Sequence, residues 1–579
     1  MKTVLPQNDS DASGRAERLA AKRETYRFAY DWPPGLATGA ELPKKDNYGP
    51  LYLLEAAKTY AAVGINVAAM ALGSDESEGL FALLEERFAN ISAEEFHKHV
   101  FSTPKEIAKS LPPRFPTHWR EYEDFFATWD KPPVVSFYDD DAKLNEAFGW
   151  QRVGGVNPMV LARVDTLPPG FGITDAIFQQ TLEGDTLQAA IAEQRLYIAN
   201  YAALENIPTG KTDNLDKFMC APIALFAVPK GQSRLTPIAI QLGQTTDAAL
   251  FTPQSGWLWR MAMQAVQIAD ANVHESMFHL GRTHMVMEAV KLCMERQLDE
   301  SHPLHRLLEK HVETTMAINH SAKTSLIAPG GTVDQCFAPT IESLVGVVAS
   351  AVKSYSIRTA SPVHDLETRG LTNTEVLEHP YRDDALLLWK AIEDFVADYI
   401  DAYYESNEAV AQDMELQAFV RELGAEEGGR LHDVPELHTT DDLKALISKL
   451  VFIAGPGHSA VNFAQFPFMG PVFNMVGASF SPMPTAESAN EEDGLTKMLP
   501  PLRIAMEGVT MVYFLSGMHP TKLGHYPPFH FRGRKANQAV HRFQKALEQI
   551  ETTINERDGD RLMTYPFLKP SLVLQSIAI

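Results

Sequence analysis

The helical periodicity of the second half of the chain is the feature that most constrains its fold. From Trp257 onward, apolar residues recur with the period of an α-helix over long segments. These segments cover residues 257–299, 303–327, 340–358, 383–404, 440–453, 503–517 and 534–557. Runs of strand-forming residues at 161–164, 221–228 and 235–242 are too few and too scattered for alternating strands and helices. The chain is therefore predicted to be a mainly α protein with a few short strands.

The first 120 residues differ in pattern from the rest. Residues 1–45 are polar and charged and are expected to form a loose arm. Residues 50–110 show helical periodicity with a break near Gly73, and a proline-rich connector follows at 111–116. We expect residues 1–120 to be an arm and a helical extension, part of the same unit as a main domain over 121–579.

The net charge of −23 on 579 residues excludes some partners. Nucleic acid needs a basic protein face, and anionic lipid attracts basic surfaces, so neither is expected to bind this chain by charge. The three cysteines lie far apart, which argues against a disulfide framework or a cysteine metal site and fits a reducing compartment. The N-terminus lacks the apolar core of a signal peptide, so a cytoplasmic location is expected.

The most apolar long stretch is residues 51–72. It is interrupted by Glu55, Lys58 and Asn66, which argues against a membrane-spanning helix. We predict a buried helix here. The alternative is a helix that dips into a membrane surface to collect lipid, so transient peripheral contact with a membrane stays open. The sequence does not indicate an oligomeric state.

Histidines cluster in the middle of the chain. Of 19 histidines, seven lie between 274 and 320, and His274, His279 and His284 are five residues apart. Residues five apart diverge on a regular α-helix, whereas a π-type turn brings them onto one face. If His279 and His284 bind one metal, the helix must therefore be widened between them. The spacing alone favours ordinary interior or surface histidines over metal ligands.

A second group of polar residues changes that balance. His458 and Asn462 are four residues apart and share one face of a normal helix. Asparagine is a poor ligand for structural zinc, which prefers cysteine and histidine. Three neutral imidazoles, one amide oxygen and one carboxylate suit iron, with a position left for water. Ligand type does not separate iron from manganese, so both stay open.

At this point the chain resembles the lipoxygenase family. The resemblance runs in order from about residue 120 to residue 579. Its landmarks are Phe148–Trp150 through Asn157-Pro158, Ala221–Ile223, Pro237–Leu242, Trp257–Ala262, the triple histidine, His302-Pro303, Tyr381–Asp384, Tyr403–Glu405, the His458/Asn462 motif and the end Ser576–Ile579. This resemblance implies a large helical lipoxygenase catalytic domain over 121–579.

The resemblance also implies a metal site, residue by residue. His279, His284 and His458 would be iron ligands, Asn462 a weaker ligand, and the terminal carboxylate of Ile579 the fifth protein group. His274 matches a histidine that is not a ligand. Glu275 and Gln465 match an outer-shell bridge that would fix the orientation of the ligands.

One departure from the family concerns the N-terminus. Eukaryotic lipoxygenases begin with a β-sandwich that docks on membranes. Residues 1–120 of this chain lack the pattern of successive short strands that such a domain requires. The chain resembles a single-domain, bacterial-type lipoxygenase without an N-terminal β-sandwich.

A long apolar pocket is implied near the iron. Leu280 and Leu326 match positions that clamp the pentadiene of a fatty acid, although both also read as plain core leucines. Ala322 matches a position where alanine accompanies S products, with a small helix-packing residue as the alternative. Cys336 and Phe337 match the pocket floor loosely.

The implied reaction is the dioxygenation of a polyunsaturated fatty acid of the linoleate, linolenate or arachidonate type. A bis-allylic hydrogen is removed, dioxygen adds to the substrate radical, and an S-type hydroperoxide results. Two alternatives stay open: a hydroperoxide isomerase on the same scaffold, and a catalytically silent lipid-binding protein. The intact set of five ligand positions argues against the second.

Overall fold

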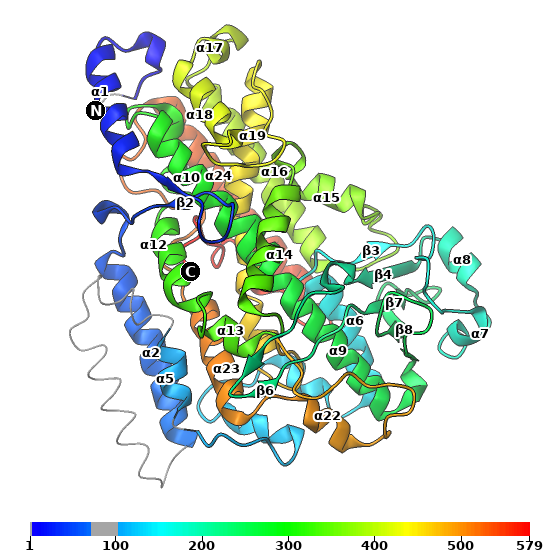
Figure 1. Cartoon of the computed structure of the whole chain (residues 1–579). Helices are drawn as coiled ribbons and strands as arrows, with labels where there is room; N and C mark the ends of the chain where they lie inside the picture. The colour runs from blue at the N-terminus through cyan, green and yellow to red at the C-terminus, as the bar shows by residue number, and fades with distance from the viewer. Residues whose placement is uncertain (1–2, 71–101, 110) are drawn as a thin grey trace.

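Residues 3–70, 102–109 and 111–579 are described by a computed structural model of the protein (Figure 1). Most of them are helical, which confirms the predicted mainly α class. Among these residues the N-terminal part holds helices and one short strand pair, not a β-sandwich. The division of the chain at residue 120 stays a prediction.

Two continuous helices form the centre of the fold. The first consists of α9 (Trp257–Val273), the π-helical segment η7 (His274–Met285) and α10 (Val286–Gln297). The second consists of α19 (Thr440–Phe452), the π-helical turn η10 (Ile453–Gly457) and α20 (His458–Asn462). Residues 261–276 of the first helix are all buried, so this part of the helix is surrounded by protein on every side. Because η10 and α20 pack against η7, the two histidine motifs meet in the core.

Other long helices surround this centre. On one side, α14 (Ile341–Ser354) packs against η7, while α16 (Pro380–Ile400) packs against α19 and α24 (Arg534–Asp558). On another, α23 (Leu502–Gly517) contacts α2 (Pro50–Met70), α5 (Thr103–Ala108), α13 (Thr332–Cys336) and α21 (Gln465–Met469). The shorter α-helices are α6 (Asp141–Gly154), α7 (Asp175–Phe178), α8 (Leu187–Ala192), α15 (Pro362–Thr368), α17 (Asn407–Ala411), α18 (Met414–Gly424) and α22 (Glu492–Met498).

An antiparallel sheet lies at one edge of the molecule (Figure 1). Its strands are ordered β3 (Ala162–Arg163), β4 (Leu196–Asn200), β7 (Ile223–Ala227), β8 (Thr236–Gln241) and β9 (Leu250–Phe251). The predicted runs at 161–164, 221–228 and 235–242 hold β3, β7 and β8, whereas β4 and β9 were not predicted. Every residue of β7 is buried, because α7 and α8 close a small apolar core on one face and the main core covers the other. Two further strand pairs are β1 (Phe28–Ala29) with β2 (Thr38–Gly39), and β5 (Lys211–Thr212) with β6 (Leu215–Asp216).

The N-terminal arm is not loose, which corrects the sequence prediction. Residues Ala12–Thr25 form α1, whose first turn is capped by Asp11, and α1 packs against α10. Arg15 is buried and forms ion pairs with Asp9 at 2.8 Å and with Glu415. Buried charges of this kind need partners, and Glu415 lies 400 positions away in the sequence. Local pattern therefore could not reveal that this polar segment docks.

The predicted helix over 303–327 is also interrupted. The structure holds α11 (Pro303–Leu308), α12 (Thr315–Ser321) and the π-helical turn η8 (Ala322–Leu326). Thr314 adopts a left-handed backbone conformation with φ of 69°. In the same connection, the ring of His311 hydrogen-bonds the Gln575 carbonyl at 3.0 Å and the Tyr526 hydroxyl at 2.9 Å. Tertiary hydrogen bonds thus hold a break that helical periodicity does not signal.

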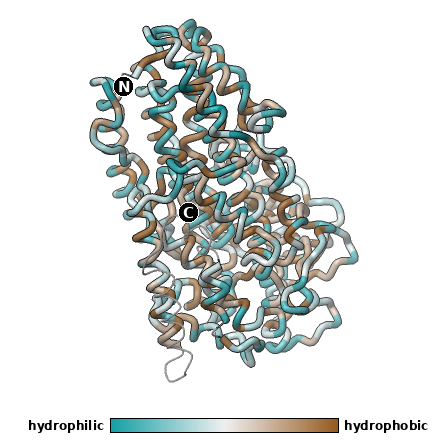
Figure 2. Tube along the Cα trace, turned by 60° about the vertical axis from the view of Figure 1, so that its left-hand side comes forward, coloured by the Kyte–Doolittle hydropathy of each residue, from teal (hydrophilic) through white to brown (hydrophobic). Residues whose placement is uncertain are grey.

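The apolar stretch at 51–72 forms α2 through Met70. One face of α2 carries the buried residues Tyr52, Tyr60 and Val63. Leu51 and Ile65 are exposed on the other face. The predicted break near Gly73 lies outside the described residues. Within the described chain, no helix has the length and apolar character needed to span a membrane. Figure 2 shows hydrophobic and hydrophilic residues mixed along the helices.

Candidate metal centre

The five-residue spacing of the histidines has a structural counterpart in η7. This segment, His274–Met285, is π-helical throughout its 12 residues and continues α9 without a break. The widened turn brings His279 and His284 onto one side of the helix, as the spacing required, so the predicted π-type turn is confirmed. The other π-helical turns of the described chain are η8, which carries Ala322 and Leu326, and η10, which directly precedes His458.

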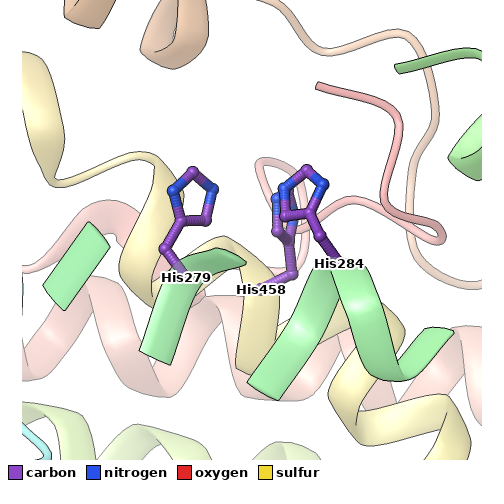
Figure 3. A group of neighbouring side chains, drawn as sticks. All are labelled: His279, His284 and His458. Atoms are coloured by element: carbon purple, nitrogen blue, oxygen red, sulfur yellow. The ribbon is translucent and has the colours of Figure 1, made fainter. Parts of the chain in front are cut away.

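Three imidazoles converge between the two central helices. Figure 3 shows the rings of His279 and His284 from η7 and of His458 from α20 on the same side of their helices. Ring centroids are 4.9 Å apart for His279 and His284, 5.4 Å for His279 and His458, and 5.0 Å for His284 and His458. One ring nitrogen from each residue lies within 4.8 Å of the others, close enough for all three to hold one metal ion.

Hydrogen bonds set which nitrogen of each η7 histidine faces the centre. The Nδ1 of His279 lies 3.0 Å from Glu275 Oε2, and the Nδ1 of His284 lies 2.7 Å from Asn319 Oδ1. Both acceptors require a proton on Nδ1, which leaves the Nε2 lone pair free. Both Nε2 atoms are buried without a hydrogen-bond partner among the described residues. An unpaired buried nitrogen is costly, and a metal ion would satisfy it.

Burial keeps the imidazoles of His284 and His458 neutral. It lowers the pKa of His284 to about 3, with the neighbouring His279 acting in the same direction. Burial also lowers the pKa of His458 well below its ordinary value, assisted by His284 and His279. Neutral imidazole is the form that binds a metal, so the site needs no proton release from these rings near neutral pH.

The predicted amide ligand and its neighbour lie beside the histidines. Asn462 is fully buried on α20, and its Nδ2 donates to the Leu515 carbonyl at 2.8 Å. Gln465 Nε2 donates to Asn462 Oδ1 at 3.2 Å. The amide of Asn462 is therefore held at both ends. Glu275 and Gln465 each hydrogen-bond a predicted ligand, His279 and Asn462 respectively, and Gln465 Oε1 has no partner among the described residues.

The last residue is in the core. Ile579 is fully buried, and the end of the chain lies in the middle of the helical body (Figure 1). The backbone of Ile579 lies beside the His458 ring, where it opposes the burial that lowers the pKa of His458. Leu574 N donates to Ser459 Oγ at 3.0 Å, which ties the terminal segment to α20.

His274 lies outside the converging set. Its Nε2 lies 2.8 Å from the Val461 carbonyl, and its ring stacks on that of His279 with centroids 5.6 Å apart. His274, Glu275 and His279 form a second group with ligand atoms within 4.8 Å. In that group, however, His279 uses Nδ1 for its bond to Glu275. The contacts of His274 therefore suit a supporting role next to the three-histidine centre.

Sequence reasoning missed the residues behind His284. Asn319 donates from Nδ2 to the His284 carbonyl at 3.1 Å and to Glu288 Oε2 at 2.8 Å, and Gly39 N donates to Glu288 Oε1 at 2.8 Å. This chain of hydrogen bonds links β2, α10, α12 and η7. Asn319 is 35 positions from His284, and no local pattern marks it as a partner.

The comparison with known proteins agrees with this geometry. The lipoxygenase family model matches residues 66–565. The chain belongs to the lipoxygenase family. It is 34% identical to a linoleate 9/13-lipoxygenase of Pseudomonas aeruginosa, over 78% of this chain and 69% of that protein. It is 30% identical to the human hydroperoxide isomerase ALOXE3, over 75% of this chain and 62% of that protein.

Solved structures show the same fold. A lipoxygenase crystallised anaerobically in complex with arachidonate superposes with a TM-score of 0.86 at 25% identity. The match covers 100% of this chain and 84% of that one. Lipoxygenases are metal-dependent dioxygenases, normally with non-haem iron, and the three converging imidazoles of this chain can hold such a metal.

The predicted pocket residues fall into two places in this lipoxygenase. Cys336 and Phe337 line a mainly apolar pocket, together with residues of α23 and of the segment 469–478. Leu280, next to His279, and Ala322 and Leu326 on η8 are buried in the main hydrophobic core.

Proposed function

We propose that this lipoxygenase is an iron enzyme that converts polyunsaturated fatty acids of the linoleate, linolenate or arachidonate type to S-type hydroperoxides. The observation that carries the proposal is the convergence of three buried imidazoles with ring nitrogens that have no hydrogen-bond partner among the described residues. Such a donor set suits a redox-active divalent or trivalent metal better than structural zinc. Manganese uses the same ligand types, so metal analysis decides between the two.

The proposed ligands are His279, His284, His458, the amide oxygen of Asn462 and the carboxylate of Ile579. Support comes from the shared space of the three rings, the fixed amide of Asn462 and the burial of Ile579 beside His458. A buried carboxylate without a partner would cost several kcal/mol, and a metal ion is a suitable partner.

Bound iron would supply the one-electron oxidation that removes a bis-allylic hydrogen. The side chains then have three tasks. Glu275 and Asn319 hold the histidine rings in one orientation through their Nδ1 atoms. Leu280 and Leu326 would position the pentadiene, and Ala322 would leave space for dioxygen on one face of it. The apolar cavity at Cys336 and Phe337 would take the far end of the fatty acid and exclude water from it.

Metal content and product formation test the proposal together. Purified protein is expected to contain about one iron per chain, to consume oxygen with linoleate and to form conjugated dienes. His458→Ala should lose both metal and activity, while the matched change His438→Ala, at a side chain that is 74% exposed, should change neither. Metal-free wild-type protein that still oxygenates linoleate would contradict the proposal.

A second candidate function is hydroperoxide isomerisation. It is favoured by the 30% identity to a protein named as a hydroperoxide isomerase. An isomerase would consume fatty acid hydroperoxide without oxygen uptake, so an oxygen electrode separates the two reactions. A silent lipid-binding protein would bind fatty acid but contain no stoichiometric metal, and the same metal analysis distinguishes it.

The place of action is a proposal as well. We propose a cytoplasmic protein with transient contact to membranes. The three free cysteines support a reducing compartment, and the exposed Leu51 and Ile65 of α2 support contact with lipid. Cell fractionation tests both statements, and recovery of the protein in an oxidising compartment would contradict the first.

A further inference from the structure

A second pocket lies on a different side of η7 from the metal centre. It has an empty volume of about 1090 Å³ and is bounded by η7, α15 and the ends of α14 and α19, of which α14, α15 and α19 are marked in Figure 1. Part of its wall is apolar, with Met159, Phe278, Phe452 and Ile453. Its rim includes the exposed residues Ser354, His364 and Thr368, so the pocket opens to solvent.

Arg282 is the unusual member of this wall. Its guanidinium lies 4.5 Å from the ring centre of Phe278 and 5.3 Å from that of Tyr355. Its Nε is buried without a hydrogen-bond partner, and no ion pair to Arg282 occurs within the described ranges. Asp365 also lines the pocket, but its carboxylate is held by Arg369. A largely buried cation without an ion-pair partner is costly and is normally paired.

The pocket is separate from the reacting centre but touches its supports. Arg282 follows His279 by three residues and precedes His284 by two, so on a helix that places both histidines on one side it faces another. Thr283, Gly457 and Val461 line the pocket, and each is next in sequence to a proposed metal ligand. The Val461 carbonyl also bonds the ring of His274. An occupant would therefore contact the backbone that holds the ligands.

The residues that line the pocket indicate which class of ligand it would bind. Arginine recognises carboxylates through paired hydrogen bonds, and the flanking rings hold the guanidinium flat. Only Arg282 offers an unpaired permanent positive charge in the wall, and the carboxylate of Asp365 is close, so a phosphate dianion is disfavoured. The apolar side chains suit a hydrocarbon tail. We propose that this pocket is a second binding site for a long-chain carboxylate, distinct from the reacting cavity, with Arg282 holding the carboxylate.

Oleate is a suitable probe because it has one double bond and no bis-allylic methylene to oxidise. Equilibrium dialysis of labelled oleate against metal-loaded protein is expected to show two sites per chain. Arg282→Gln should weaken one of them at least tenfold and leave the other unchanged. Lys353→Gln, the matched change at an exposed lysine outside the pocket wall, should keep both sites. Oleyl alcohol, which lacks the carboxylate, should fail to displace oleate from the second site.

A second variant outside η7 controls for the possibility that Arg282→Gln disturbs the folding of that segment. Thr359→Trp places a large side chain at a half-buried position of the pocket wall and should also remove the second site. The proposal is overturned if the wild type binds no oleate, or if no oleate site is lost in either Arg282→Gln or Thr359→Trp. Whether the reacting cavity also binds oleate changes the number of sites but not this comparison, so the test is separate from the proposed fatty acid oxygenation.

Discussion

The buried carboxyl group of Glu288, near the metal centre, predicts a pH dependence of the stability of this protein. Glu288 is fully buried on α10 and accepts hydrogen bonds from Gly39 N and from Asn319 Nδ2, the residue that orients His284. Burial raises the pKa of Glu288 from its ordinary 4.5 to about 7, although both hydrogen bonds act to lower it. The side chain therefore titrates near neutral pH, two hydrogen bonds away from a proposed ligand.

The sign of the effect on stability follows from proton binding. Unfolded Glu288 loses its proton near pH 4.5, whereas the folded protein keeps it until about pH 7. Between these values the folded state binds more protons, so the free energy of unfolding falls as the pH rises. A difference of about 2.5 pKa units corresponds to about 3 kcal/mol, at 1.36 kcal/mol per unit. This contribution is fully present below pH 4.5 and is lost as the pH rises through 7.

Glu288→Gln removes the titration and one of the accepted hydrogen bonds. The lost bond costs about 1–3 kcal/mol at every pH. Relative to wild type, the variant should therefore be less stable at pH 4.5 and should gain about 3 kcal/mol by pH 8. Urea unfolding of the two proteins at matched pH values measures this difference. Glu436→Gln, at a side chain that is 88% exposed, is the control and should run parallel to wild type. If the Glu288→Gln curve is also parallel to wild type between pH 4.5 and 8, the reasoning is refuted.

Three further predictions concern the metal and the product. Asn319→Ala removes the acceptor for His284 Nδ1 and should weaken metal binding about 10–100-fold in a competition titration, and unchanged affinity would show that Asn319 does not orient the ligand. A single glycine added after Ile579 moves the carboxylate by about 3.5 Å. That protein should fold but lose iron, whereas Ile579→Val should keep it, and full iron content in the extended protein would remove the carboxylate from the ligand set. Ala322→Gly should change the chirality or position of the hydroperoxide, since one methyl group is worth about 1–3 kcal/mol in selectivity. Chiral chromatography measures the change, and an unaltered product mixture would exclude Ala322 from the site.

Part of the candidate site was predictable because it depends on spacing along a single helix. Residues five apart share a face on a π-helix but not on an α-helix. His279 and His284 can therefore bind one metal only if the helix between them is π-helical, as η7 is. His458 and Asn462 are four apart and belong together on any α-helix. That the two pairs address one centre was implied by the family resemblance, because no spacing argument links positions 284 and 458.

Other features were beyond local pattern because their partners are distant in the sequence. The polar N-terminal arm docks through Arg15 and Glu415, and the break before α12 coincides with hydrogen bonds from His311 to the C-terminal segment. The helical pattern over 303–327 does not indicate that the amide of Asn319 lies against His284. In each case the determining interaction is a hydrogen bond or ion pair between elements that only folding brings together.

The sequence by itself determined the helical class and the residue types available to bind a metal, and it located the π-type turn on the condition that His279 and His284 share one metal. These follow from periodicity and from the chemistry of individual side chains, which do not depend on the rest of the fold. Only the tertiary structure decided which nitrogen of each η7 histidine is free, that Ile579 is buried beside His458, and that Arg282 faces a separate pocket. The physical reason is that burial and hydrogen bonding set the protonation and orientation of a side chain, and both depend on neighbours from distant parts of the chain.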